Sequence, residues 1–501
     1  MRERQVARPK GIASLARPKP RRSVHWGVTL ALLVTSGVSF AFMQTLVVPA
    51  LPFFQREFDS TATWTAWIAT GFLISSSVLT PILGKLGDTY GKKRLLVISM
   101  GVFAFASIGA AFSTSLLMIV LFRVVQGAGA AVFPLAFGIM RDQFPANRVG
   151  IGIGTMSSVF GLGGGLGLVA SGVILETLSW PWLFLVGAVP TLVVIVLIGV
   201  LVPESPPQAR TRPDWLGGLT LSLSLVALLL AVSEGNAWGW ASGGVLGLFA
   251  AAVALFAVWV RIEKRVRDPM VDIDMLSSRP IAVTNAATVL IGFAMFGSFI
   301  LLPAFVQAPR GLAPDVAEQV TYGFAASPIA TGLFFLPSSL AMILAGPLAG
   351  WIGGRWGWGL PLRAGLGSIA LGVFLLAFIH DSPWNVYAFM IFHGVGVAAA
   401  LAAVGALVIE NVAPGDTGVA GGMNSIMRTT GAAFGAQLSS TLATTFVIPG
   451  TAVASELGYT IALAITASAA LLGLLITLLL VPPGRRMQLL RARRPAAAQA
   501  S

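Results

Sequence analysis

Long apolar runs recur along the whole chain, and they constrain its fold more than any other feature. A helix needs roughly 20 apolar residues to cross about 30 Å of hydrocarbon, and fourteen segments meet that requirement. The runs are apolar on all sides without period-two alternation, which favours helices over a β-barrel. Because only 10% of the residues are charged and 56% are hydrophobic, a soluble enzyme and a disordered scaffold are excluded. We therefore predict an all-α integral membrane protein. The predicted spans are 27–51, 65–83, 95–112, 116–140, 150–175, 182–202, 215–233, 243–260, 281–306, 328–352, 361–379, 384–409, 419–444 and 457–481.

The 32 Lys and Arg residues are distributed asymmetrically between the predicted loops. Twenty-eight fall on one side, Arg56 and Arg310 fall on the other, and Arg123 and Arg428 lie inside spans. Cytoplasmic loops carry the excess of basic residues, so we expect both termini, with the basic tails 1–26 and 482–501, to be cytoplasmic in the cell (inner or plasma) membrane. Short basic clusters between apolar runs are typical of membrane topology, and no nucleic-acid partner is expected. The chain has no Cys, which excludes disulfides and thiolate sites.

A weak internal repeat relates the two ends of the chain. Residues 84–94 (GKLGDTYGKKR) and 350–360 (GWIGGRWGWGL) align at an offset of 266, with three coincident glycines. Duplicated halves are a common plan of secondary transporters. The repeat predicts two six-helix bundles, 27–202 and 281–481, with two inserted helices within 203–280. Chance alignment of glycine-rich membrane sequence is the alternative.

The segment 84–94 is the most specific motif and is predicted to be a gating loop. Its glycines allow a tight turn between closely packed helices, its bases hold the loop at the cytoplasmic face, and an acid among bases requires a partner. The alternative is a topogenic loop with a local salt bridge that contributes little energy. The residues assigned to this loop are Gly84, Asp88, Gly91, Lys92, Lys93 and Arg94.

Charged and small residues inside the spans form a second group. A charge within a span is costly and indicates a functional site, which applies to Arg123 and Arg428. Gly127, four residues after Arg123, and Gly163 and Gly167, in a glycine ladder, are predicted to serve helix packing and bending. The ladder lacks the Lys-Ser/Thr of a phosphate-binding loop, so we expect no nucleotide and no other cofactor.

Together these motifs resemble the major facilitator superfamily. The loop 84–94, the Arg123 signature and the glycine ladder match its signature motifs. Asp214-Trp215-Leu216-Gly217 and the two inserted spans resemble its fourteen-helix drug:proton antiporter branch. The resemblance implies a proton-driven rocker-switch exporter of drugs or antibiotics, with a latch at Asp88. The start of the span at 419 offers a positive helix end, so we predict Asp88 near Thr417 to Ala420 in an outward-facing state.

Two positions depart from the family pattern. Relatives usually carry an acid in the first span, where this chain has Met43 followed by Gln44. The fifth span usually has Gly-Pro, where this chain has Gly167-Leu168, so that helix is expected to bend differently.

None of the 19 acids is predicted to lie mid-membrane. The candidates for proton coupling are therefore His393, Asp88 and Glu410, although a lone His among glycines is also typical of a packing residue. A cavity with buried arginines and no acid favours neutral, zwitterionic or anionic amphipathic compounds over lipophilic cations. The alternative is that both arginines are structural pins neutralised by carbonyls and hydroxyls. The residues predicted for the central cavity are Gln44, Arg123, Gln126, His393, Asn424 and Arg428.

The expected partners are a small amphipathic substrate, protons and the lipid bilayer. A facilitator or uptake permease of the same fold without proton coupling is the main alternative. A membrane enzyme would need clustered His, Asp or Glu, whereas His25, His380 and His393 are scattered, so no catalytic residue, metal site or enzyme activity is predicted.

Overall fold

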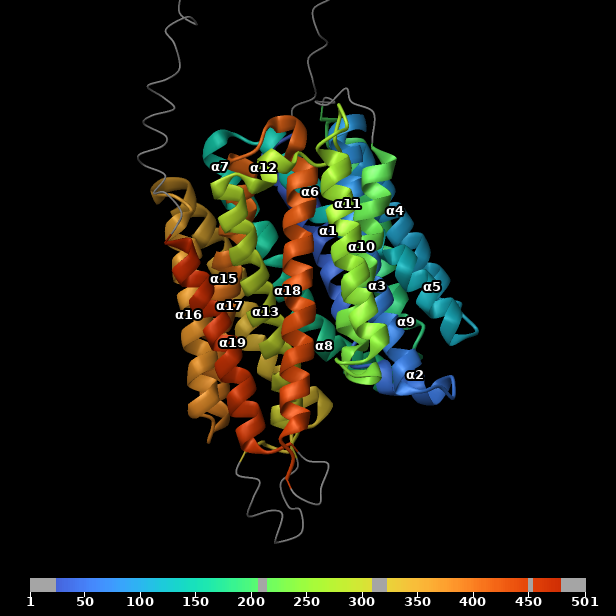
Figure 1. Cartoon of the computed structure of the whole chain (residues 1–501), viewed down its shortest axis with the longest axis vertical. Coiled ribbons are helices and arrows are strands. Elements are labelled where there is room, and N and C mark those ends of the chain that lie inside the picture. The colour runs from blue at the N-terminus through green and yellow to red at the C-terminus, as the bar shows by residue number, and fades with distance from the viewer. Residues whose placement is uncertain (1–23, 206–213, 309–321, 449–453, 479–501) are drawn as a thin grey trace, which may run out of the picture.

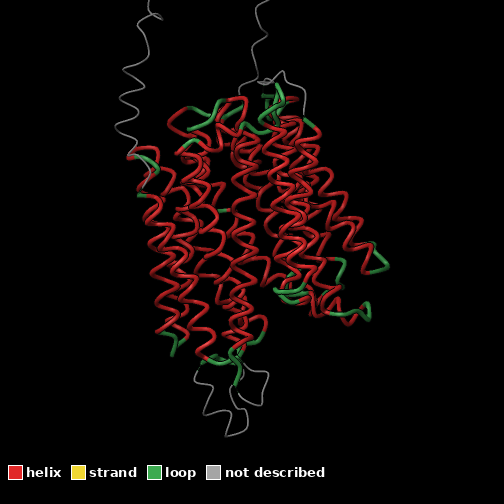
Figure 2. The backbone as a smooth tube through the Cα atoms, viewed as in Figure 1, coloured by secondary structure: helices red, strands yellow, loops and turns green. Residues whose placement is uncertain are grey.

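The computed structural model describes residues 24–205, 214–308, 322–448 and 454–478, and within these ranges the chain forms helices and no strands (Figures 1 and 2). The predicted all-α fold is therefore confirmed for the described residues. The predicted tail 482–501, most of the tail 1–26, and Arg310 lie outside these ranges. The elements are α1 (Trp26–Leu46), α2 (Leu51–Glu57), α3 (Ala62–Tyr90), α4 (Lys92–Ala111), α5 (Leu116–Gln126), η1 (Gly127–Ala131), α6 (Val132–Gln143), α7 (Ala146–Ser157), α8 (Val159–Thr177), α9 (Trp182–Leu201), α10 (Trp215–Trp238), α11 (Gly243–Glu263), α12 (Ile273–Ser277), α13 (Arg279–Gln307), α15 (Pro328–Trp356), α16 (Gly359–Phe378), α17 (Pro383–Glu410), η2 (Pro414–Asp416), α18 (Thr417–Thr445) and α19 (Glu456–Thr477).

Thirteen helical segments within the described ranges are long and apolar enough to cross a membrane. The remaining predicted span, 419–444, corresponds to α18, which is 29 residues long but more polar. It carries Asn424, Arg428 and Gln437 and packs against α13 and α3. It therefore lies between other helices, away from much of the lipid, which explains why its composition differs from that of its neighbours.

Two predicted boundaries are wrong in an informative way. The first span ends at Leu46 instead of residue 51, because a turn with Pro49 separates α1 from the short helix α2. The segment 84–94 is almost entirely helical and is not a loop: α3 continues to Tyr90 and α4 begins at Lys92. Gly91 alone makes the tight turn, with φ 109° and ψ 125°, a conformation that requires glycine.

Ser, Thr and Asp side chains begin many of the helices. Thr61, Ser115, Asp214, Ser242 and Ser382 each accept a hydrogen bond from a backbone N–H in the first turn of the helix that follows. These N-caps satisfy donors that have no partner within the helix. They fix where each helix leaves the loop before it.

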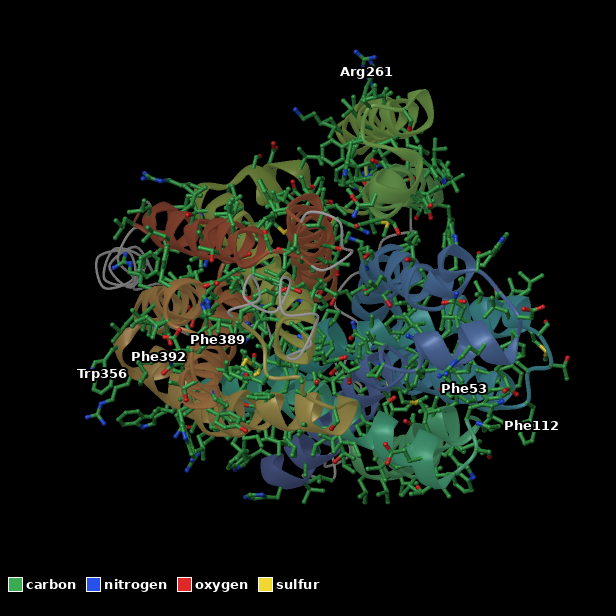
Figure 3. The ribbon with its side chains drawn as sticks, turned by 90° about the horizontal axis from the view of Figure 1, so that it is seen from below. Phe53, Phe112, Arg261, Trp356, Phe389 and Phe392 are labelled. Atoms are coloured by element: carbon green, nitrogen blue, oxygen red, sulfur yellow. The ribbon has the colours of Figure 1, made fainter. Side chains whose placement is uncertain are left out.

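The repeat extends from sequence into structure. Helices α3 and α15 are each 29 residues long, their bounds differ by 266, and each ends at a glycine with positive φ, Gly91 (109°) and Gly357 (96°). Helix α3 packs against α18, and α15 packs against α7. Helices α10 and α11 pack against each other at one edge, seen end-on in Figure 3 beside Arg261, and α10 also contacts α3 and α18.

A candidate cavity and its closing contacts

Asp88 joins α3 to the N-terminus of α18, as predicted. Its Oδ2 accepts hydrogen bonds from the backbone N–H groups of Gly418 (2.7 Å) and Val419 (3.3 Å). The side chain is buried, and the positive end of the α18 dipole compensates part of the cost of burying its charge. This contact, between residues 330 positions apart in the chain, is more than the local salt bridge that was the alternative interpretation.

The three bases that follow Gly91 have different surroundings. The Lys92 ammonium is buried, 2.8 Å from Asp142 Oδ2 and 3.7 Å from Asp88 Oδ1. The Lys93 ammonium donates to the carbonyl of Gly199, and the backbone N–H groups of Lys93 and Arg94 lie 3.1 and 3.4 Å from Glu204 Oε1. Lys92 thus belongs to the buried contact around Asp88, and does not lie at the surface as expected. We call the end of the helices that carries these residues the basic end.

Arg141 makes a contact that the sequence analysis missed. Its guanidinium donates to Val412 O (3.1 Å) and Thr417 Oγ1 (2.9 Å), which tie the end of α6 to the turn between α17 and α18. Lys85 lies 3.7 Å from Asp416 at the same turn. The only sequence signal for Arg141 was its position in the last turn of a span, where a base can bind the carbonyls of a helix terminus.

Glycines allow these helices to approach closely. A Cβ on Gly84 would lie 2.7 Å from the carbonyl carbon of Gly418, and one on Gly350 would lie 2.9 Å from the carbonyl carbon of Gly150. Any side chain at these positions would therefore separate the N-terminal helices α1–α9 from the C-terminal helices α13–α19 at the basic end.

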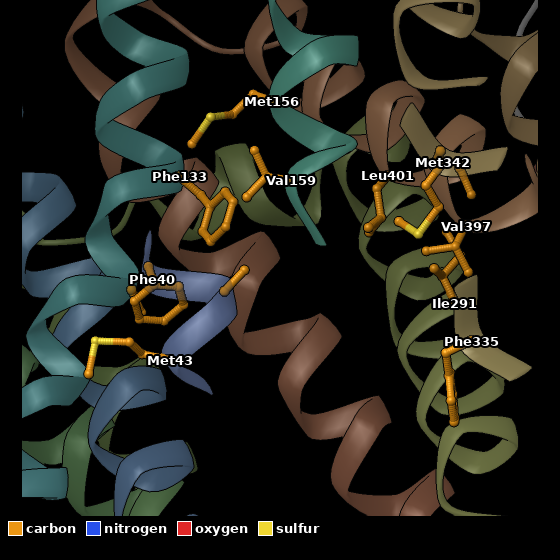
Figure 4. Packing of buried hydrophobic residues seen from close by; sticks show 14 of the residues in the cluster. Phe40, Met43, Phe133, Met156, Val159, Ile291, Phe335, Met342, Val397 and Leu401 are labelled. Carbon is orange, nitrogen blue, oxygen red and sulfur yellow. The ribbon is translucent and has the colours of Figure 1, made fainter. Parts of the chain in front are cut away.

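Three adjoining cavities, which we call the central cavities, lie between these two sets of helices. The first holds about 910 Å³ of space, including space open to solvent, and is lined by α1, α3, α5, α8, α13, α15 and α17. The others hold about 640 and 530 Å³ and share Arg428 in their walls. Figure 4 shows Phe40 and Phe133 on one side of this region and Phe335 and Met342 on the other. No Asp or Glu among the described residues lines any of the three, as predicted.

The structure brings together most of the predicted cavity residues. Gln44, Arg123 and His393 line the 910 Å³ cavity, and Gln44 also lines the 640 Å³ cavity. Asn424 lines the 530 Å³ cavity with Arg428, and its amide donates to Asn285 (3.0 Å) and Thr288 (2.8 Å) on α13. The polar groups are thus spread along the central cavities.

Gln126 lies behind Arg123 and not on a cavity wall. Arg123 Nη1 donates to Gln126 Oε1 (2.7 Å), and Gln126 Nε2 donates to Ser107 Oγ (3.0 Å). Arg123 Nε donates to Ile68 O (3.1 Å), and the guanidinium lies 4.1 Å from the centroid of the Phe72 ring. This network braces α5 against α3 and α4.

Arg428 has a different environment. Its guanidinium lies 4.8 Å from the centroid of the Phe160 ring, and it makes no hydrogen bond or ion pair with any described residue. Phe160 is next to Gly161, the residue that aligns with Arg428 in the repeat. The opposing helix therefore supplies a ring face, and not a second charge, to Arg428.

The candidates for proton coupling also differ in their surroundings. The His393 ring is buried beside the Met295 backbone, but neither ring nitrogen makes a hydrogen bond of normal geometry with a described residue. Glu410 accepts a hydrogen bond from Trp358 Nε1 (2.8 Å) at the basic end. At the opposite end, His380 lies 2.8 Å from Glu456, and burial raises the pKa of Tyr322, which donates to Ala454 O.

The remaining predicted positions serve packing. Met43, at the place of the family's acid, is buried against Gly187 and lines none of the central cavities. Thr45 Oγ1 donates to Gly163 O (2.7 Å), and both Gly163 and Gly167 lie too close to α1 for a Cβ. The helix breaks between α7 and α8 at Ser158. Gly127 begins the 3₁₀ turn η1 and lies against Ser75 of α3. At all three glycines a neighbouring helix lies within contact distance of the position that a Cβ would take.

Comparisons with known proteins agree with this architecture. The chain is 27% identical over 426 residues to the tetracenomycin C resistance and export protein of Streptomyces glaucescens, covering 84% of this chain and 76% of that protein. It is 28% identical over 456 residues to a multidrug resistance protein B homolog of Mycobacterium tuberculosis, covering 87% and 80%. The crystal structure of the human organic anion transporter MFSD10 (TETRAN) is similar in fold, with a TM-score of 0.64 and 15% identity, over 90% of this chain and 98% of that one. Residues 33–436 match the model of one family, and the chain therefore belongs to the Major Facilitator Superfamily.

Proposed function

We propose that this transporter exports amphipathic drugs, antibiotics or metabolites by alternating access, driven by the proton gradient. In this proposal the two six-helix bundles, 27–202 and 281–481, rock about the central cavities, and both termini are cytoplasmic in the plasma membrane. Membership of the family and relatives named for antibiotic resistance and export support it.

The observation that carries the proposal is the closing contact at the basic end. Asp88, Arg141 and the paired glycines hold α3 and α6 against α18 and its preceding turn. The 910 Å³ cavity lies farther from the basic end than this contact does. Its walls include Thr45 and Val48, at the end of α1 that is farthest from the basic end. With the basic end in the cytoplasm, this arrangement corresponds to an outward-facing state.

Proton coupling is assigned to His393 and Asp88, with Glu410 as a third candidate. His393 lines the 910 Å³ cavity and would be reached by protons from the open side. Protonation of Asp88 removes the charge that the N-terminus of α18 attracts, which lowers the cost of separating the bundles at the cytoplasmic end.

The walls of the central cavities favour neutral, zwitterionic or anionic substrates. Phe72, Phe160, Phe296 and Phe299 offer apolar and aromatic surface, and Arg123 and Arg428 supply positive charge without a neighbouring carboxylate. A lipophilic cation would meet repulsion that no described acid on these walls offsets.

A facilitator or uptake permease without proton coupling is the second candidate. The absence of Asp and Glu from the described walls of the central cavities favours it, because acids within spans are the usual proton carriers.

Inverted membrane vesicles with an acidic lumen separate the two candidates. Tetracenomycin C, the compound in the name of one relative, is the probe. The proposal expects accumulation that stops when nigericin collapses the pH gradient, and that is lost in the double variant His393→Gln, Asp88→Asn. Counterflow without accumulation, unaffected by nigericin, would support the facilitator. Absence of both accumulation and counterflow would exclude tetracenomycin C as a substrate and remove support for export of that class.

A further inference from the structure

Arg428 has hydrogen-bond donors that no described residue uses. A guanidinium has five N–H donors, yet this one makes no hydrogen bond or ion pair with a described residue and lies over the Phe160 ring. It lines both the 530 and the 640 Å³ cavities. A cation in the interior of a membrane protein normally pairs with an acid or a carbonyl. Arg428 is therefore poised to bind a group that enters from the cavity.

Arg123 is not equivalent. It is 1% exposed, its Nε and Nη1 donate to Ile68 and Gln126, and Phe72 covers its face. These contacts fix its position and use part of its donor capacity. Of the two arginines in the spans, Arg123 matches the structural pin, and Arg428 does not.

A second residue with an unpartnered polar group lines the same cavity. Ser76 is 8% exposed, its hydroxyl has no hydrogen-bond partner among the described residues, and it lines the 640 Å³ cavity with Arg428. The neighbouring hydroxyls of Thr80, Ser77 and Thr429 donate to carbonyls in their own helices. Buried polar groups without partners are rare. The buried hydroxyl of Ser76 and the half-buried guanidinium of Arg428, whose donors no described residue uses, together indicate a polar ligand in this cavity.

We propose that Arg428 and Ser76 bind the anionic group of an amphipathic substrate, a carboxylate or a sulfonate. Such a group can accept two parallel N–H hydrogen bonds from the guanidinium and one O–H hydrogen bond from the hydroxyl. The aromatic part of the substrate lies against Phe40, Phe72, Phe133 and Phe296, which line the same cavity; Figure 4 shows the first and third of these. Because no described acid lines the cavity, the anion of the substrate supplies the counter-charge of Arg428.

This inference rests on the proposed function and narrows it to a substrate class. The inference also places the anionic group of the substrate beside α18, the helix that begins at the closing contact. Asn424 and Thr417 line the 530 Å³ cavity with Arg428, one and about three helical turns from it. An anion bound to Arg428 therefore contacts α18, the same helix whose N-terminal N–H groups donate to Asp88.

Matched naphthyl probes test the proposal in the full chain reconstituted in nanodiscs. The probes are naphthalene-1-sulfonate, its neutral sulfonamide and 1-naphthyltrimethylammonium, measured by equilibrium binding. We expect the wild type to bind the sulfonate most tightly and the ammonium most weakly. Arg428→Gln should weaken sulfonate binding by about tenfold or more, the loss typical of a charge-assisted bond, and leave the sulfonamide unchanged. Arg428→Lys should restore part of the preference, and Ser76→Ala should weaken sulfonate binding a few-fold. Arg355→Gln, an exposed arginine beside Trp351 and Trp356, is the matched control.

Transport in proteoliposomes separates this inference from the proposed function. Transport of the sulfonate with an unchanged sulfonate-to-sulfonamide ratio in Arg428→Gln would overturn the anion site and leave the exporter standing. An Arg428-dependent preference in binding without transport of any probe would retain the site and count against the exporter. No preference for the sulfonate in the wild type would overturn the inference. If Arg428→Gln fails to fold, Arg428→Lys and Ser76→Ala decide the same question.

Discussion

Replacing Gly84 by alanine should open the contact at the basic end. The new Cβ would lie 2.7 Å from the carbonyl carbon of Gly418, whereas carbon atoms normally stay about 3.5 Å or more apart. Helices α3 and α18 must then separate by roughly 0.8 Å, which stretches the Asp88–Gly418 bond from 2.7 Å to about 3.5 Å and removes the weaker bond to Val419. Loss of these charge-assisted bonds costs about 1.5–3 kcal/mol, so the ratio of closed to open molecules should fall roughly 10- to 150-fold.

Spin labels can measure this change because the chain has no native Cys. Labels at Tyr90→Cys and Asn411→Cys, both exposed at the basic end, report the separation of the N- and C-terminal helices by pulsed electron resonance. We expect a second, longer distance population in Gly84→Ala. Gly101→Ala is the control, because a Cβ there meets nothing within 4 Å. Identical distance distributions for Gly84→Ala and Gly101→Ala would refute the steric argument.

Three further substitutions test the surroundings of the cavity. Asp88→Asn keeps an acceptor oxygen but loses the charge facing α18, which should cost about 1 kcal/mol and shift the same spin-label populations about fivefold; no shift would show that the charge is irrelevant. Gly91→Ala forces a side chain into φ 109°, which should cost about 1–2 kcal/mol and lower the melting temperature followed by tryptophan fluorescence, relative to Gly101→Ala. Arg123→Leu removes the donor for Gln126 Oε1, so we expect a loss of about 1–3 kcal/mol in the same melting experiment; an unchanged melting temperature would contradict its role as a brace.

Hydropathy predicted most of the fold because the membrane fixes the length and composition of each span. Helices α9 and α13, for example, begin and end within two residues of the predicted segments. The errors occur where local chemistry overrides hydropathy. The turn before α2 cuts the first span short, and polar residues such as Asp88 extend α3 beyond its apolar run.

The partner of Asp88 could be predicted because a helix N-terminus is a general anion site. Lys92 and Arg141 could not be placed in the same way. Whether a basic residue near a helix end faces solvent or a neighbouring helix depends on the rotation of that helix. Here the rotation of α4 directs Lys92 toward Asp142 on α6.

The two arginines within spans also could not be distinguished from the sequence. Arg123 is braced by Ile68 and Phe72, which lie about 50 residues away on α3. Arg428 meets Phe160 of α8, on the opposite side of the cavity. The difference arises from the helices that pack against each arginine, and a local motif contains no information about them.

The repeat makes the closing contacts geometrically similar but chemically different. Gly84 meets Gly418, and Gly350 meets Gly150, so both pairs of helices pack through glycine. At the offset of 266, however, the residue that corresponds to Asp88 is Gly354, which has no carboxylate.

Neither α7 nor α18, the helix to which it corresponds, is capped by the side chain of its own N-cap residue, so the carboxylate of Asp88 at α18 is the difference between the two. The buried Lys92–Asp142 ion pair is likewise replaced, at nearly the same offset, by a hydrogen bond from Trp358 to Glu410. Separating α3 from α18 therefore breaks charge-assisted bonds, whereas separating α15 from α7 breaks mainly close helix packing. Because charge-assisted bonds respond to protonation and glycine packing does not, protonation of Asp88 should weaken the contact between α3 and α18 and leave the contact between α15 and α7 unchanged.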